Sequence, residues 1–133
     1  MLDYLKLYGI AFVVFFIVDI VWLSLVAKDL YNKEIGSLLK PDVNWVAAII
    51  FYLLFILGLV VFVIEPSVAS SSLGKAMLLG AFFGLVTYAT YDLTNLATMK
   101  DFTLKITLID LTWGTALGFL TSTLTYLIND WLF

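Results

Sequence analysis

Three aspartates lie inside long apolar stretches of the sequence, and each has aromatic neighbours at helical spacing. Asp19 precedes Trp22 and Asp110 precedes Trp113, whereas Asp92 stands in the stretch Tyr-Ala-Thr-Tyr-Asp-Leu-Thr-Asn. Ionisable side chains inside a membrane-spanning segment cost free energy and mark functional sites. The three carboxylates therefore predict a site within a membrane, where the neighbouring rings can offer their faces to a cation.

Hydrogen-bond donors accompany these acids. In a helix, Tyr88 and Asp92 lie on one face, with Tyr91 and Asn95 beside it. Tyr52 is the only strongly polar side chain in another apolar stretch. We therefore expect a ligand- or ion-binding site, to which we assign no particular metal. Its candidate residues are Asp19, Asp92, Asp110, Tyr52, Tyr88, Tyr91, Asn95, Trp22 and Trp113.

The composition is that of a protein whose partner is a lipid bilayer. Of 133 residues, 63% are hydrophobic and 13% are charged, whereas soluble domains are about half apolar and about a quarter charged. The seven basic residues are scattered lysines, which argues against nucleic-acid binding. Because the chain has no Cys and no His, it has no ligands for a Cys/His zinc site or a His-bound haem. A bound cation is the one cofactor that we expect.

The apolar runs predict an all-α integral membrane protein with four antiparallel transmembrane helices. A helix needs about 20 apolar residues to cross a bilayer, and these runs are too long for barrel strands. Pro66 marks the end of the second span, because proline disfavours helix at the residue before it. The first loop, residues 28–44, should hold a short interfacial helix that ends before Pro41. The predicted spans are residues 5–27, 45–64, 73–99 and 104–128, within a single membrane domain of residues 1–133.

The acids lie at similar depth in this arrangement. The loops after the first and third spans are on the same side, and Asp19, Asp92 and Asp110 are nine, eight and five residues from lysines there. The helical rise converts these spacings to depths of about 14, 12 and 8 Å, and Tyr52 lies at about 10 Å. We expect these side chains, with Asn95 in reach, to converge around a polar cavity that opens toward the first and third loops.

Small residues mark the helix faces that pack together. Gly80 and Gly84 on the third span, and Gly114 and Gly118 on the fourth, let neighbouring backbones approach closely. An alternative interpretation of the acids follows from this packing. Each Asp would then be a protonated or hydrogen-bonded staple between helices, and the rings would be ordinary packing.

Three functions fit these features. The first is binding or transport of a proton, a metal ion or a small cation, because the buried acids have no basic partner inside the spans and must hold protons or a cation. Transport through so few helices would need a homodimer. The second is a membrane enzyme that acts on lipid, with carboxylates that hold a divalent metal or act as acid and base, although the chain has no arginine, and no lysine deep inside the spans, to hold an anionic substrate. The third is a structural or accessory subunit. We favour the first, and assign no catalytic residue.

The lysines set the predicted orientation. Positively charged loops remain in the cytoplasm, which places both termini outside and the acids in the cytoplasmic half of the membrane. The first and third loops and their borders carry Lys28, Lys33, Lys40, Lys100 and Lys105, against Lys6 and Lys75 on the opposite side.

Short motifs run along almost the whole chain: Tyr4-Leu-Lys-Leu-Tyr8, Asp19-x-x-Trp22-Leu23, Glu34-Ile-Gly36, Asn44 through Phe51-Tyr52, Gly80-Ala-Phe-Phe-Gly84 and Asp110-x-x-Trp113-Gly114. The most specific is residues 88–98, Tyr-Ala-Thr-Tyr-Asp-Leu-Thr-Asn-Leu-Ala-Thr. Together they resemble a family of small bacterial membrane proteins known as a domain of unknown function. After residue 98 that family tends to continue with Lys-Asp-Trp, whereas this chain has Phe102 in the place of the tryptophan. The resemblance implies a four-helix protein of the bacterial inner membrane and implies no activity.

Overall fold

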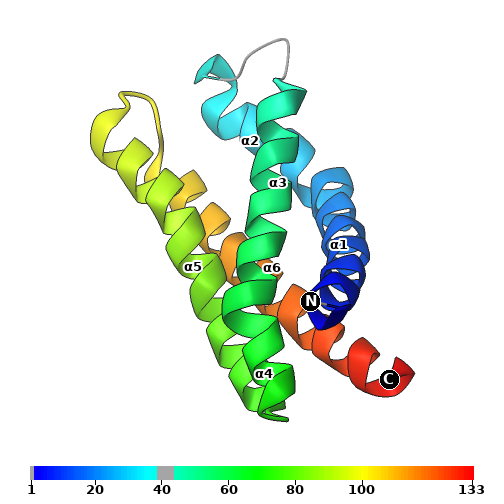
Figure 1. Cartoon of the computed structure of the whole chain (residues 1–133). Helices are drawn as coiled ribbons and strands as arrows, with labels where there is room; N and C mark the ends of the chain where they lie inside the picture. The colour runs from blue at the N-terminus through cyan, green and yellow to red at the C-terminus, as the bar shows by residue number, and fades with distance from the viewer. Residues whose placement is uncertain (1, 39–43) are drawn as a thin grey trace.

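The computed structural model describes residues 2–38 and 44–133, and the regular structure in these ranges is helical throughout (Figure 1). The predicted break at Pro41 lies outside the described residues. Two π-helical segments interrupt the α-helices. The elements are α1 (Leu2–Trp22), η1 (Leu23–Ala27, π-helical), α2 (Lys28–Ile35), η2 (Gly36–Leu38, 3₁₀), α3 (Trp45–Leu59), η3 (Val60–Ile64, π-helical), α4 (Glu65–Ala69), α5 (Leu73–Thr98) and α6 (Leu104–Leu132).

Three helical stretches are long and apolar enough to cross a membrane, namely Asp3–Leu25, Trp45–Ala69 and Leu73–Thr98. They confirm the prediction of a helical membrane protein. Their outer faces expose large apolar side chains that lipid would cover, such as Leu78, which is 75% exposed. α6, with 29 residues, is also long enough to span a bilayer, but it is less apolar than the other three because threonines and other polar residues form much of its buried face.

The second of these stretches corrects a prediction. The sequence predicts that its helix ends at Ile64, but the helix continues through η3 and α4 to Ala69. The π-helical turn explains the difference, because the Glu65 N–H bonds to the Val60 carbonyl five residues earlier. This wider turn accommodates the ring and the missing N–H of Pro66 within a continuous helix.

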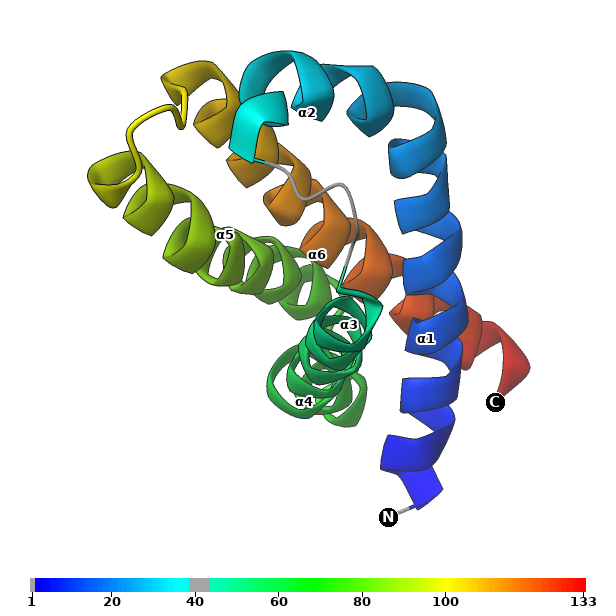
Figure 2. The ribbon, with the colours of Figure 1, turned by 90° about the horizontal axis from the view of Figure 1, so that it is seen from above.

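α5 and α6 lie side by side along their lengths (Figures 1 and 2). A Cβ atom placed on Gly80 would lie 2.6 Å from the Gly118 carbonyl oxygen, and one on Gly84 would lie 2.8 Å from the Gly114 carbonyl carbon. Real Cβ atoms essentially never make such short contacts, so only glycine fits at these positions. Rising residue numbers on α5 meet falling numbers on α6, so this pair of helices is antiparallel.

The first loop holds the expected short helix, and that helix packs against the end of the α5–α6 pair. The chain turns sharply at η1, so that α2 crosses over the start of α6 (Figure 2). Ile35 of α2 is buried in an apolar cluster with Phe102 and Ile106. A larger apolar core, which includes Phe15, Ile56 and Leu117, lies among α1, α3 and α6.

Candidate functional site

An open pocket of about 220 Å³ lies among the helices, beneath α2. Its lining comes from α1, η1, α2, α3, α5 and α6, so that the turn at η1 and the α5–α6 pair both shape it. Hereafter it is called the acid pocket. Its lining combines carboxylates, phenols and indoles with one aliphatic side chain: Asp19, Asp110, Tyr31, Tyr52, Tyr88, Trp22, Trp113 and Leu23.

Asp110 is anchored by a residue of the first loop. The hydroxyl group of Tyr31 on α2 donates a hydrogen bond to Asp110 Oδ1. Burial, together with the hydrogen bond to Asp110 and its negative charge, raises the pKa of Tyr31 above its usual range. The phenol therefore stays protonated and remains a donor to the carboxylate.

Asp92 lies behind Asp110 and is completely buried. Neither of its carboxyl oxygens has a hydrogen-bond donor among the described residues, and Asp110 of α6 is the acidic group near it. Two adjacent carboxylates repel each other in a low-dielectric interior, whereas a protonated carboxyl group can donate to its neighbour. The geometry therefore fits one proton shared by Asp92 and Asp110.

The third acid and the indole rings complete the pocket. Asp19, which is 6% exposed, lines it together with Tyr52 and Tyr88. The rings of Trp22 and Trp113 stack face to face, with centroids 4.5 Å apart and planes 5° apart. This stack joins α1 to α6 at the edge of the pocket.

Two of the predicted site residues lie elsewhere on α5. Tyr91 is 55% exposed and packs edge-on against Phe102, with ring centroids 6.0 Å apart. Asn95, one helical turn further along α5, is half-buried. Neither residue lines the acid pocket. The structure therefore groups Asp19, Asp110, Tyr52, Tyr88, Trp22 and Trp113 around one space, and the buried Asp92 lies near Asp110 but does not line that space.

Residues 4–127 match the model of a protein family described as "predicted membrane protein (DUF2177)". The chain belongs to this family. The match covers all three acids and every residue that lines the acid pocket, and it confirms the resemblance found in the motifs. No curated protein and no solved structure matches the chain. Membership in DUF2177 thus establishes a membrane protein, and the geometry of the pocket must carry any argument about function.

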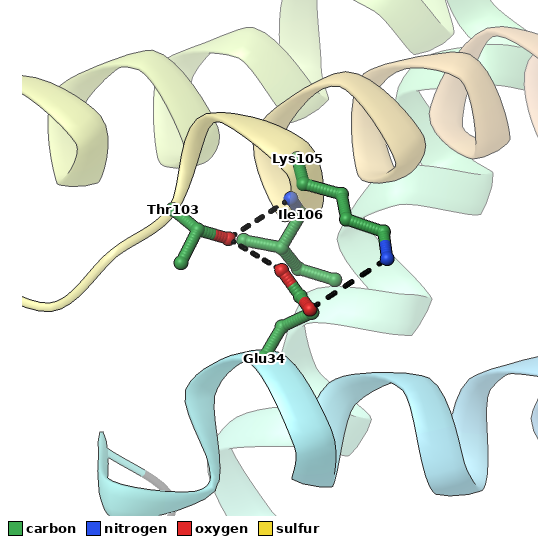
Figure 3. A network of polar contacts seen from close by, with 4 residues as sticks. All are labelled: Glu34, Thr103, Lys105 and Ile106. Carbon is green, nitrogen blue, oxygen red and sulfur yellow. Dashed lines mark hydrogen bonds and ion pairs between the residues drawn. The ribbon is translucent and has the colours of Figure 1, made fainter.

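A polar network joins α2 to the start of α6 in this DUF2177 member (Figure 3). Glu34 accepts a hydrogen bond of 3.0 Å from Thr103 Oγ1 and lies 3.8 Å from Lys105 Nζ. Thr103 also caps α6, because its hydroxyl oxygen accepts from the backbone N–H of Ile106. The network fixes the position of α2, and therefore of Tyr31, relative to the start of α6.

Sequence reasoning placed Tyr31 on an interfacial helix and missed it as a site residue. The available signal was a phenol on the apolar face of that helix, above acids predicted in the same half of the membrane. A metal site has less support, because no group of three or more acidic side chains in the described part of the chain lies close enough to hold an ion.

Proposed function

We propose that the acid pocket binds a small organic cation in exchange for the proton held by Asp92 and Asp110. The pocket lining supplies two carboxylates, three phenols and two indoles, and it includes no basic side chain. Carboxylates supply the charge that a buried cation requires, and indole and phenol rings attract cations through their faces. The observation that carries the proposal is a buried Asp92 with no hydrogen-bond donor among the described residues, near Asp110, which lines an aromatic pocket.

The exchange follows from the chemistry of the pair. With the pocket empty, one proton reduces the repulsion between the two carboxyl groups. An entering cation stabilises the charged form of Asp110 and favours loss of that proton. Binding should therefore release protons and weaken as the pH falls. Transport by this exchange would need two copies of the chain, since four helices are few for a pathway.

The same lining gives little support to an enzyme that acts on lipid. A phospholipid headgroup carries a phosphate, which proteins usually hold with Arg or Lys. The acid pocket offers no such side chain, and Lys105 pairs with Glu34 outside it. A cation is therefore the better fit.

The proposal includes four antiparallel spans in the bacterial inner membrane, with both termini outside. α6 can serve as the fourth span because its polar side chains, such as Thr121 and Thr125, are buried against other helices. The lysine-rich first and third loops then face the cytoplasm. Because the natural chain has no cysteine, Ser71→Cys and Asp101→Cys can be labelled singly. We expect an impermeant thiol reagent to label the first in intact cells and the second only after permeabilisation. Labelling of both from outside would contradict the arrangement.

Binding is tested with tetramethylammonium, by calorimetry on protein in lipid nanodiscs. We expect Asp92→Asn and Asp110→Asn to weaken binding by about tenfold or more, since interactions with a charged group contribute about 1.5–3 kcal/mol. The matched control is Asp130→Asn, an exposed acid of α6 far along the chain from the pocket. Titration in buffers of different ionisation enthalpy measures the released protons. If all three variants bind tetramethylammonium with the affinity of the wild type, the proposal is wrong, and the acids serve only to hold the helices together.

A further inference from the structure

The outer side of the α1–α6 contact carries an apolar groove of about 330 Å³. Leu108, Ile109 and Ala116 form much of it, and Trp22 and Trp113 complete its wall. The same two indoles line the acid pocket. The stacked pair therefore has an acidic, aromatic space on one side and an apolar groove on the other.

We propose that the bound cation is amphiphilic, with its charged group in the acid pocket and its hydrocarbon chain in the apolar groove. This inference rests on the proposed function and narrows the ligand to long-chain organic amines and their quaternary analogues. The acid pocket and the apolar groove share Trp22 and Trp113, so one molecule that extends past these two rings can occupy both the pocket and the groove. Their volumes, about 220 and about 330 Å³, together fall within the roughly 300–1,000 Å³ typical of small-molecule sites.

Charge complementarity distinguishes this groove from a second one on the surface. That groove, of about 200 Å³, lies between η3 and α5 and includes Phe62, Phe82 and Val86. No acidic side chain lines this second groove, so it has no group that would favour a cationic amphiphile over an ordinary lipid. The groove beside the tryptophans shares both rings with the acid pocket, and Asp19 and Asp110 line that pocket. An amphiphile with a cationic group gains there an interaction that ordinary lipid cannot make.

The test compares two probes that differ in the hydrocarbon chain, tetramethylammonium and octyltrimethylammonium, by calorimetry on the full chain in nanodiscs of zwitterionic lipid. Ala116→Phe fills the groove with a ring, and overpacking of this kind should weaken binding of the octyl probe by about tenfold. Binding of tetramethylammonium should stay unchanged, which also shows that the acid pocket is intact. Val86→Phe makes a matched change in the second groove and controls for effects of the bilayer.

Leu108→Ala provides a second variant that should fold normally, because Leu108 is 56% exposed on the outer face. It removes a contact with the chain, and we expect it to weaken octyltrimethylammonium by a few-fold and to leave tetramethylammonium unchanged. If Ala116→Phe loses both probes, Leu108→Ala decides the question. Equal effects of Leu108→Ala on the two probes would overturn the inference and leave a site for small cations. An equal loss of affinity for the octyl probe in Val86→Phe and Ala116→Phe would overturn it as well. Failure of the wild type to bind either probe would refute the proposed function itself.

Discussion

Replacing Gly84 with alanine should separate α5 from α6. The added Cβ would lie 2.8 Å from the carbonyl carbon of Gly114 and closer still to its oxygen. Both are backbone atoms, so no side chain can rotate away to make room, and the helices must move apart. Overpacking of this kind costs about 1–3 kcal/mol. Alanine gains up to about 1 kcal/mol in helix propensity, but that gain shrinks in a membrane, where the unfolded chain keeps its helices. We therefore expect a net loss of about 2 kcal/mol.

The matched control is Gly74→Ala in the first turn of α5. A Cβ there meets no atom within 4 Å, so the variant should be as stable as the wild type or slightly more stable. Reversible unfolding in mixed micelles with rising SDS, followed by tryptophan fluorescence, gives the free energy of unfolding for all three proteins. Equal stability of the Gly84 and Gly74 variants would refute the close contact between the two backbones.

The same substitution links packing to the site. Gly84 and Gly114 hold the two helices at the separation that places Asp92 against Asp110. A wider separation would pull these carboxyl groups apart and weaken the sharing of their proton. Gly84→Ala should therefore also reduce the number of protons released when tetramethylammonium binds, whereas Gly74→Ala should leave it unchanged. An unchanged proton release in a clearly destabilised Gly84→Ala protein would contradict this link.

Two further predictions concern the contacts that hold α2. Tyr31→Phe removes the hydrogen bond to Asp110 and should cost about 1–2 kcal/mol in SDS unfolding. Tyr4→Phe, which alters a 40% exposed phenol, should cost almost nothing, and equal losses in the two variants would show that the Tyr31 bond adds no stability. Thr103→Val removes the cap on the Ile106 N–H and should cost about 1 kcal/mol. It should also speed hydrogen exchange in α2 and in the first turn of α6, and unchanged exchange in α2 would argue against the network as its anchor.

The sequence predicts the bounds of a helix well where a local pattern decides them. The third predicted span, residues 73–99, nearly coincides with α5, because the cap at Ser72 and the turn after Thr98 bound the apolar run. The end of the second span was wrong, because the rule for Pro66 assumes a regular α-helix. A π-helical turn lets the helix continue through Pro66, and the residue preferences in the sequence do not predict such a turn.

The candidate site shows a similar division. Depth along a helix follows from residue count, and the structure does place Asp19, Asp110 and Tyr52 around one pocket. Rotation about the helix axis depends on packing, and here Tyr91 turns outward to meet Phe102. Tyr31 was missed because its hydrogen bond joins residues 79 positions apart, across a turn that the sequence does not specify. The role of these residues in binding remains a prediction.

The π-helical segment η1 sets the rotational phase between α1 and α2. A π-helical turn holds one residue more than an α-helical turn, so the same residues in a regular α-helix would complete more than one turn. If Leu23–Ala27 took that form without losing a residue, everything after it would rotate by about 100° around the helix axis. Tyr31 would then leave Asp110, and Ile35 would leave its apolar cluster. Loss of one residue from the segment would instead restore the α-helical turn and leave α2 nearly in phase, so a chain that is one residue shorter here can keep both contacts.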